Sequence, residues 1–540
     1  MKLYTIGYDF KDTIVQLDNL RFSIRLFTEV NVYAPDPESV EVLNTESKVS
    51  LKANKLSWAG NQQKANGSIE LNVCREANGS YSIEAIGKHA DELCKSVLIQ
   101  IYDINIKSIE FDQKNIVGFE KNLDIKSRIY PNDIKMPLVF AHDRHDSMWY
   151  ALSKDKQLRA KAFASHYDPF LQTQVLDLSH EEDKRFRSNE IVMPKWQVGS
   201  CNDKRTVILE RFKDLEENFG LVPFEERNDT PGWLKDIKLV TILHGEHWTG
   251  HVFNTFKQME ESLEWIANKI DGENVLVFLP GWDGRYYYNY PLYEPSKKMG
   301  GEKGLKSLVE KAHQLKMKII PMLGANNANI EILKSLNMED VSLKDSWGHE
   351  KRVEWVDWDY DLFKENNCIL ANIGNPIYLQ HMIQKSKHLL DDYLFDGIFL
   401  DLPNRWENDP EYSPYEGLLE WAKELNENYT DILLFGEDSY DVLWGVFSMF
   451  HEIWQPGGHE YSLYRYAMQT HYLAYPAPGM GSGGIHEYAW DQNGPMWERD
   501  IPELVPTLSI VDGTISNHPQ SSETLISKAK SWTPTQFWKI

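Results

Sequence analysis

The sequence predicts a protein of mixed α/β and all-β class, with an N-terminal β-sandwich followed by a (β/α)8 TIM barrel. The chain has 540 residues, more than one hydrophobic core usually organises. Its first part alternates apolar and polar residues in runs of strand length. From residue 238 onward, short continuous apolar runs alternate with amphipathic helical stretches, as parallel βα units require. These observations together predict the two-part architecture.

The N-terminal part shows the alternation of half-buried strands. Clear examples are residues 20–34, 68–87 and 96–111, and the Asn-Gly-Ser turn at 78–80 interrupts the second of them. Such strands pair into antiparallel sheets, and two sheets that bury one face each form a sandwich. The polar, Pro-Gly-containing stretch 226–236 marks the end of this part. We therefore expect an N-terminal domain over 1–235 and a catalytic barrel over 236–540, with a short tail.

Eight apolar runs follow one another in the second part. They cover residues 237–248, 275–284, 317–327, 397–404, 432–441, 446–458, 470–479 and 504–513. Helical patterns lie between several of them, as in 304–317, whose apolar residues share one helix face. Eight strands with intervening helices predict a (β/α)8 barrel. The third-to-fourth connection is lengthened by an insertion at 344–367, and the fifth-to-sixth connection is too short for a full helix.

The composition excludes several classes of partner. A net charge of −24 argues against nucleic acid and against anionic membrane surfaces, because both repel an acidic protein. No run approaches 18 apolar residues, and the start has no signal-like apolar region. We expect a cytoplasmic protein, or a periplasmic or secreted one if a signal peptide has been removed. Usage rich in Lys, Asn and Ile is typical of a bacterial source.

The four cysteines indicate neither a zinc site nor a disulfide framework. Cys74, Cys94, Cys201 and Cys368 have no metal-ligand spacing. A Cys74–Cys94 disulfide remains open, with buried free thiols as the default. We expect no metal and no cofactor.

Two acids end consecutive apolar runs. Asp401 closes the fourth run and Glu437 closes the core of the fifth. The C-terminal ends of barrel strands open onto one face, and neighbouring strands lie about 4.8 Å apart, so these side chains can converge. Two facing carboxylates suit glycoside hydrolysis, with retention at a separation of roughly 5 Å and inversion at roughly 6.5–9.5 Å. The alternative is that both acids cap helices or form ion pairs.

The acid in such a pair needs a raised pKa, which apolar walls or a second carboxylate supply. Trp406 and Trp454 are candidates for the walls.

Other polar and aromatic residues near strand ends are candidates for binding substrate. The loop after the second run is rich in tyrosine and contributes Trp282, Asp283 and Arg285, for stacking on a sugar ring and bonding to hydroxyls. The alternative is that its aromatic residues pack the loop onto the barrel. Further candidates for substrate binding are His244, Glu246, Asn404, Trp454, His486, Glu487 and Asp491.

Two of these groups have competing interpretations. His244 and Glu246 belong to a histidine-rich stretch, for which sugar contacts or loop packing are favoured over a metal site. His486, Glu487 and Asp491 lie in a glycine-rich loop, where Glu487 is the reserve candidate for a catalytic acid. Asp512 is a weaker reserve.

The stretches DGIFLD (396–401) and LLFGE (433–437) resemble the catalytic strands of retaining alpha-glycosidases. These include the alpha-amylase superfamily, the alpha-galactosidase (melibiase) clan and the endo-alpha-N-acetylgalactosaminidases. The resemblance implies that Asp401 is the nucleophile and Glu437 the acid/base. Residues 371–401 are also similar to the helix and strand that lead to the nucleophile in those enzymes, many of which carry a β-sandwich before the barrel.

The motifs also depart from these families. Phe399 stands where the alpha-amylase motif has an arginine and the melibiase motif a lysine, and Pro519 stands where a seventh-strand Asp is expected. The pattern is closest to that of the endo-alpha-N-acetylgalactosaminidases, without establishing membership.

The sequence therefore predicts a hydrolase that cleaves an alpha-glycosidic bond of an oligo- or polysaccharide with retention. One alternative is an inverting or beta-specific glycosidase that uses Glu487. The others are a catalytically inactive carbohydrate-binding protein and a metal hydrolase.

Overall fold

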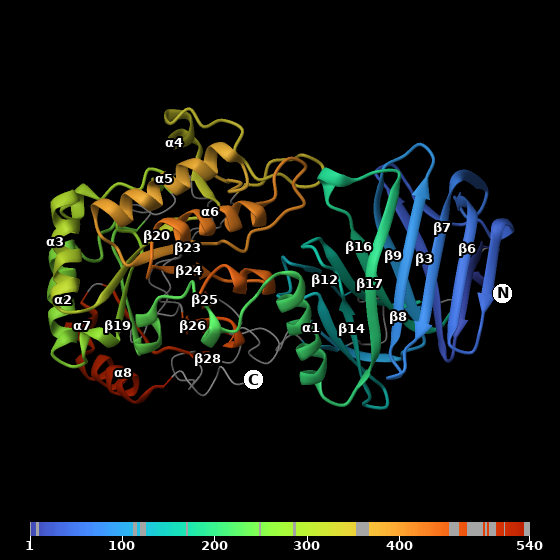
Figure 1. Ribbon diagram of the computed structural model, residues 1–540, viewed down its shortest axis with the longest axis horizontal. Coiled ribbons are helices and arrows are strands. Elements are labelled where there is room, and N and C mark those ends of the chain that lie inside the picture. Colours follow the sequence, from blue (N-terminus) through green and yellow to red (C-terminus); the bar gives the residue numbers. More distant parts are fainter. Residues whose placement is uncertain are drawn as a thin grey trace. The chain divides into compact units, whose positions relative to one another are not determined.

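The chain forms two compact units (Figure 1). The computed structural model describes residues 2–6, 10–111, 116–118, 126–168, 171–247, 250–284, 288–352, 367–452, 464–471, 490–491, 494–495, 504–511 and 513–533. The first unit holds the chain up to Gly220 together with residues 440–442, and the second begins at Leu221. Whether an independently folding domain ends at residue 235 stays a prediction.

The first unit is built from antiparallel strands and one α-helix. The strands are β1 (Lys2–Ile6), β2 (Phe10–Leu17), β3 (Leu20–Thr28), β4 (Val32–Pro35), β5 (Val40–Asn44), β6 (Lys48–Trp58), β7 (Gln63–Arg75), β8 (Tyr81–His89), β9 (Cys94–Tyr102), β10 (Ile106–Glu110), β11 (Ile116–Gly118), β12 (Lys126–Tyr130), β13 (Leu138–Asp143), β14 (Met148–Ser153), β15 (Lys161–Asp168), β16 (Thr173–Glu181) and β17 (Glu190–Cys201). Helix α1 (Lys204–Asn218) follows and begins at the N-cap Asp203. The expected β-rich first part is confirmed.

These strands pair in two runs. One run has the order β12-β15-β16-β9-β3-β2-β1. The other has the order β11-β10-β13-β14-β17-β8-β7-β6-β5, and β4 pairs with both β3 and β6. Buried aromatic rings of the two runs meet, since Phe22 lies 6.3 Å from Tyr81 and Phe163 lies 5.2 Å from Trp196, centroid to centroid.

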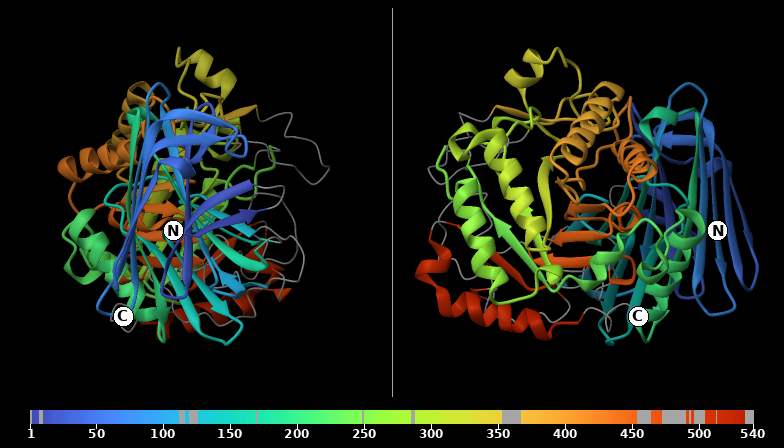
Figure 2. Two further views of the ribbon diagram at one scale, coloured as in Figure 1. Left: turned by 90° about the vertical axis from the view of Figure 1, so that its right-hand side faces the viewer. Right: turned by 60° about the vertical axis from the view of Figure 1, so that its left-hand side comes forward.

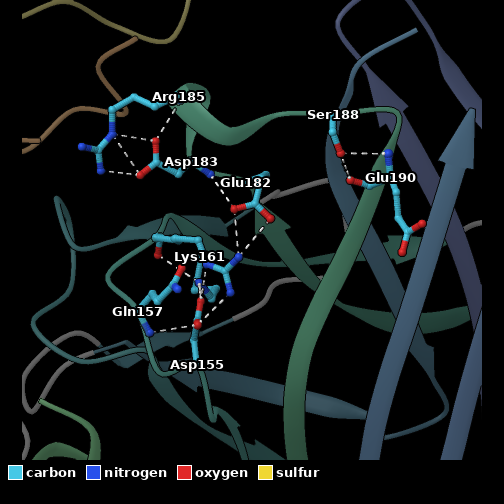
Figure 3. A network of polar contacts seen from close by, with 9 residues as sticks. Asp155, Gln157, Lys161, Glu182, Asp183, Arg185, Ser188 and Glu190 are labelled. Carbon is cyan, nitrogen blue, oxygen red and sulfur yellow. Dashed lines mark hydrogen bonds and ion pairs between the residues drawn. The ribbon is translucent and has the colours of Figure 1, made fainter. Parts of the chain in front are cut away.

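A buried charged network lies in this first unit (Figure 3). Asp155 accepts hydrogen bonds from the Arg159 guanidinium at 2.8 and 3.0 Å and from Lys161 Nζ at 2.7 Å. Arg159 also binds Glu182 at 2.8 Å. Burial by itself raises the pKa of Asp155, but the charge of Lys161 and the Arg159 bonds outweigh it and hold that pKa well below its usual range. Burial lowers the pKa of Lys161 to about 8, against the opposing charge of Asp155.

The second unit contains an eight-stranded parallel sheet. Its strands are β18 (Leu239–Leu243), β19 (Val275–Leu279), β20 (Lys318–Gly324), β23 (Gly397–Asp401), β24 (Leu433–Glu437), β25 (Met449–Glu452), β26 (Met468–His471) and β29 (Thr507–Ile510). They lie in the order β26-β25-β24-β23-β20-β19-β18-β29, and all neighbours are parallel. A parallel bridge between Thr470 and Val505 joins the two ends, which makes the sheet a near-barrel. Each strand coincides with one of the eight apolar runs, although the seventh begins at Met468 rather than at residue 470.

Helices lie between these strands or after the last of them. They are α2 (Phe256–Ala267), α3 (Gly301–Gln314), α4 (Ile330–Ser335), α5 (Pro376–Asp392), α6 (Pro414–Asn428), α7 (Thr514–Asn517) and α8 (Pro519–Ser531). Helix α2 packs beside α3, and α5 beside α6 (Figure 2). Between β24 and β25 there is only the 3-10 helix η8 (Asp441–Gly445), as expected from the short connection.

Four short strands complete the described elements. The long connection between β20 and β23 holds the pair β21 (Asn327–Asn329) and β22 (Cys368–Leu370) together with α4. A further pair is β27 (Trp490–Asp491) and β28 (Gly494–Pro495).

Two chain-wide features qualify the sequence expectations. Cys74 and Cys94 are not joined to each other, so the disulfide that the sequence left open is not formed. Within the described ranges, no helix has the length and apolarity needed to cross a membrane.

Candidate active site

An aromatic layer fills the interior of the parallel sheet. The rings of Phe278, Phe399 and Phe435, on β19, β23 and β24, lie 4.3 to 6.1 Å apart, centroid to centroid. Because alternate residues of a strand share a face, Asp401 and Glu437 point to the same interior, one step nearer the C-terminal ends of their strands. Phe399, the departure from the alpha-amylase motif, is therefore part of the apolar floor beneath the two acids.

Asp401 and Glu437 lie together and are buried, at 2% and 3% exposure. Burial raises the pKa of Glu437 well above its usual range, and the charge of Asp401, a hydrogen bond to Asp401 and the charge of Asp438 raise it further. A hydrogen bond from the Leu402 N–H to Glu437 Oε2, at 3.3 Å, acts in the opposite direction. The protonated form of Glu437 is therefore favoured, and in that form it donates a hydrogen bond to the Asp401 carboxylate.

The residue after each acid has a left-handed backbone. Leu402 has φ +52° and Asp438 has φ +56°, a region that costs a residue with a Cβ roughly 1–2 kcal/mol. Asn404 links the two turns, because its Nδ2 donates to Asp438 Oδ2 at 3.0 Å. The Asn404 Oδ1 is buried without a hydrogen-bond partner in the described structure. Asn404, a candidate from the sequence, thus lies between the loops that follow β23 and β24.

His451 is a further group at this level that sequence reasoning missed. It lies on β25 in register with Glu437 and is fully buried. Its ring is 5.8 Å from Phe399 and 6.3 Å from Phe435, so it faces the same interior as the acids. The signal was its position: a polar residue ending the apolar core of the sixth run, as Asp401 and Glu437 end theirs.

Asp283 and Glu246 are both buried but differ in their partners. Glu246 accepts from Lys298 Nζ at 2.7 Å and from Ser296 Oγ at 2.7 Å, so it anchors the loops after β18 and β19 to each other. Asp283 is 3% exposed, and its carboxylate has no hydrogen bond to another residue of the described chain. Burial, and then the charge of Glu246, raise the pKa of Asp283 well above its usual range. A neutral carboxyl both donates and accepts, which suits binding of a hydroxyl.

The aromatic loop after β19 packs onto β20. Trp282 is fully buried, and its Nε1–H donates to the Met322 carbonyl at 2.9 Å. The Tyr293 hydroxyl donates to the Gly324 carbonyl at 2.9 Å and accepts from the Gly324 N–H at 3.0 Å. The Tyr290 ring occupies the space beside Gly324, where an added Cβ would lie 2.4 Å from it. These contacts favour the loop-packing alternative for Trp282, and ring stacking on a sugar stays a prediction.

His244 is bound within the interior of the sheet. Its Nε2 lies 2.7 Å from Ser509 Oγ on β29, and Asn254 Nδ2 donates to its carbonyl at 2.9 Å. A sugar contact from His244 stays a prediction. In the part of the chain that the structure describes, no three His, Cys, Asp or Glu side chains are grouped closely enough to hold a metal ion.

Several sequence candidates lie outside the described residues. They are Arg285, Trp454, His486, Glu487 and Asp512, together with the side chain of Asp491. Trp406, the other expected wall residue, is buried after β23 at 8% exposure.

Two asparagines directly after β20 were also missed. Asn326 and Asn327 are 1% and 0% exposed. Neither side-chain atom of Asn327 has a hydrogen-bond partner in the described structure, nor does Asn326 Oδ1. Buried amides of this kind are rare outside functional sites. The sequence signal was a pair of polar residues at the end of an apolar run. By itself, such a pair is equally typical of an ordinary turn.

Comparisons with known proteins agree with this architecture. No family model matches the sequence. A stretch of 173 residues is 24% identical to 1,4-alpha-glucan-branching enzyme 2-2 of Arabidopsis thaliana and covers 31% of this chain; the chain spans only 20% of that enzyme's length.

Solved structures match over most of the chain. The ligand-free alpha-N-acetylgalactosaminidase NagBb from Bifidobacterium bifidum superimposes with TM-score 0.63 and 12% identity, over 96% of this chain and 93% of that one. The GH36 alpha-galactosidase AgaA from Geobacillus stearothermophilus gives TM-score 0.51 and 10% identity, over 96% and 75% of the two chains. At these identities the likeness defines the fold: the chain has an alpha-glycosidase-like fold.

Proposed function

We propose that this protein is a glycoside hydrolase that cleaves an alpha-glycosidic bond of an oligo- or polysaccharide with retention of configuration. The observation that carries the proposal is the buried, hydrogen-bonded pair Asp401 and Glu437 at the ends of neighbouring strands. Carboxyl groups in hydrogen-bond contact lie closer than the roughly 6.5–9.5 Å that an inverting pair needs to hold a water between them. The alpha-glycosidase-like fold, with its eight-stranded parallel near-barrel sheet, supports the same proposal.

The first step forms a covalent intermediate. Asp401 attacks the anomeric carbon, the glycosidic C–O bond breaks, and Glu437 gives its proton to the leaving oxygen. The raised pKa of Glu437 suits it to this role, because it favours the protonated form that a general acid needs. Asp401 is then an uncharged ester.

The second step regenerates the carboxylate. Loss of the Asp401 charge removes one of the causes that raised the pKa of Glu437, so the deprotonated Glu437 persists as a base. It takes a proton from water, whose oxygen attacks the anomeric carbon and releases Asp401. Two inversions at one carbon give net retention.

Substrate hydroxyls would be bound by the buried polar groups around the pair. Asp283, Asn327 and Asn404 each carry buried side-chain atoms without a partner in the described structure, so a sugar can satisfy them. The structural neighbours are named for alpha-galactose and N-acetyl-alpha-galactosamine chemistry, which makes alpha-galactosides and N-acetyl-alpha-galactosaminides the first substrates to test.

Product stereochemistry tests the proposal directly. Aryl alpha- and beta-glycosides are screened, and NMR identifies the anomer first released. We expect an alpha-glycoside to give the alpha-anomer first. Release of the beta-anomer from an alpha-glycoside, or turnover of beta-glycosides alone, would contradict it.

Rescue by azide assigns the two roles. With an activated aryl alpha-glycoside, Glu437→Ala should form the alpha-glycosyl azide, because azide replaces water in the second step. Asp401→Gly should form the beta-azide, because azide attacks directly from the face that Asp401 occupied. Identical products from the two variants would rule out this assignment.

A further inference from the structure

We infer that Asn326 is a positioning residue for the general acid, acting through the peptide of Leu402. The inference rests on the proposed function and adds a residue to its machinery. Asn326 follows β20, whereas Leu402 follows β23 and Glu437 ends β24, so one chain of contacts crosses three neighbouring strands.

Asn326 is held from two sides. Its Nδ2 donates to the Leu402 carbonyl at 2.5 Å. Its backbone carbonyl accepts a hydrogen bond from the Ala371 N–H. The side chain is 1% exposed, so the amide is locked in the interior rather than at a solvated rim.

Leu402 needs such a restraint. Its φ of +52° is unfavourable for a residue with a Cβ, and the turn tends to relax unless neighbouring groups hold it. Besides the Asn326 amide, the Leu402 carbonyl accepts from the Arg405 N–H at 3.3 Å, a longer bond within the same loop. The hydrogen bond from Asn326 is therefore the shorter of the two, and it comes from the loop after a different strand.

The restrained turn aims an N–H at the acid. The Leu402 N–H donates to Glu437 Oε2 at 3.3 Å. This bond lowers the pKa of Glu437, whereas burial and the charges of Asp401 and Asp438 raise it. If the turn relaxes, the bond weakens and the proton is held more tightly, so protonation of the leaving group slows.

The test is a pH profile of kcat and KM for an aryl glycoside with Asn326→Ala. We expect kcat to fall roughly 10- to 100-fold, the size expected for a misplaced catalytic group. The limb at which kcat declines with rising pH should move to higher pH, because Glu437 loses its proton later. KM should stay within about twofold, because Asn326 acts on the acid and not on the sugar.

Asn375→Ala is the matched control. The Asn375 side-chain amide accepts from the Ile377 N–H at 3.0 Å and donates to the Asp340 carbonyl at 3.2 Å. The substitution therefore also removes a side-chain amide that donates to a backbone carbonyl, but at the start of α5. It should lower the unfolding temperature without moving the pH limb. An active Asn326→Ala enzyme whose limb stays at the parent pH would refute the positioning role. If that variant does not fold, Asn326→Asp, which has the same shape without the donor, replaces it.

The outcome is separable from that of the proposed function. Parent turnover and its loss in Asp401→Asn test glycoside hydrolysis itself. The shift of the limb in Asn326→Ala tests only the Leu402 connection.

A separate surface feature points to an outer sugar-binding site, and we propose that Trp347 binds sugar units of the substrate beyond the cleaved bond. This also rests on the proposed function. The Trp347 side chain is 58% exposed on the long connection after β20. Asp345 makes its turn rigid by accepting from the N–H groups of Trp347 at 2.9 Å and His349 at 3.0 Å. An exposed ring held in place offers a flat face for a sugar ring at little entropic cost.

This turn is fastened to the loop that follows Asp401. The Lys344 N–H donates to Asp409 Oδ2 at 2.8 Å, and Lys344 Nζ binds Glu411 at 2.8 Å. Because loops after barrel strands share the face on which the acids lie, the ring belongs to the rim of the candidate site.

Comparing a short and a long substrate tests this site. In Trp347→Ala, kcat/KM for an alpha-linked polysaccharide should fall about tenfold, whereas kcat/KM for the aryl monosaccharide should not change. Trp58→Ala is the control, because Trp58 is also exposed, at 40%, but lies on β6 of the other unit. Equal effects on both substrates, or none on the polysaccharide, would exclude the outer site. Hydrolysis of the aryl substrate by the parent reports separately on the proposed function.

Discussion

Buried carboxylates occur in both units, but their surroundings differ. Asp155 of the first unit is 5% exposed and is bound by Arg159 and Lys161, with contacts of 2.7 to 3.0 Å. Glu437 and Asp283 of the second unit are each 3% exposed, and within the described ranges the charged side chains that shift the pKa of each are carboxylates. Their pKa values accordingly move in opposite directions: down for Asp155, up for the other two.

The difference separates an architectural acid from a functional one. Burying a charge is costly unless a partner offsets it, so a core that only needs stability either pairs the charge or omits it. A site that must move a proton needs a carboxyl that stays neutral, and it accepts the cost. Burial alone therefore does not indicate a candidate catalytic acid; a buried carboxyl whose pKa is raised by a second carboxyl is the better indicator.

The largest effect should come from the acid pair. Asp401→Asn and Glu437→Gln should each lower kcat by roughly 10⁴-fold on a substrate with a poor leaving group. Both should leave the free energy of unfolding unchanged or raise it, because they remove like-charge repulsion from a buried site. Parallel kinetics and urea unfolding measure this. A large loss of stability in either variant would mean that the pair is architectural, as Asp155 is.

The next largest effect should come from Asp155. Asp155→Ala leaves the buried Lys161 without its anion and Arg159 with only Glu182, and we expect a loss of about 3–5 kcal/mol in the free energy of unfolding. Urea unfolding of the full chain measures it. Glu217→Ala, which breaks an exposed pair with Lys213, is the control and should cost less than about 0.5 kcal/mol. Equal losses of stability in the two variants would mean that Asp155 is no more important to the fold than an exposed ion pair.

The pH dependence of stability should differ in sign between Asp155 and Asp283. The folded pKa of Asp155 lies below its unfolded value, so its contribution is present above an ordinary carboxyl pKa of about 3.9 and is lost on acidification. The folded pKa of Asp283 lies above its unfolded value, so stability is lost as pH rises from about 4 toward that folded pKa.

The matched variants are Asp155→Asn and Asp283→Asn. From pH 2 to pH 7, the first should become less stable relative to the parent, mostly below about pH 5, and the second more stable, mostly above about pH 4. Thermal unfolding across that range gives both slopes. Slopes of the same sign would show that the surroundings described for one of these two carboxyls are incorrect.

The smallest effect should come from the aromatic loop. Trp282→Phe removes one buried hydrogen bond, to the Met322 carbonyl, and should cost about 1–3 kcal/mol in the free energy of unfolding, because that carbonyl is left without the bond. If Trp282 only packs the loop, KM for the aryl glycoside will not change. A severalfold increase in KM without loss of stability would restore the ligand-stacking interpretation.

The strands of the parallel sheet could largely be predicted from the sequence. Continuous apolar runs mark strands that are buried on both faces, so all eight were located, and Asp401 and Glu437 were identified because each ends such a run. His451 ends the apolar core of its run in the same way. It was missed because Asp401 and Glu437 were identified as a pair of carboxylates, and a histidine does not fit that pattern. Asn326 escaped notice because an asparagine after a strand is also the commonest kind of turn residue.

Local pattern is enough to say which segments become strands, which helices cover them and which residues stand at strand ends, because hydrophobic periodicity acts within a few residues of chain. Whether a buried acid meets a cation, as Asp155 does, or another acid, as Glu437 does, depends on side chains brought together from distant segments. The charge state of those groups follows from that meeting. The pKa of each acid is therefore decided by packing, because electrostatic free energy depends on distances that no single stretch of sequence contains.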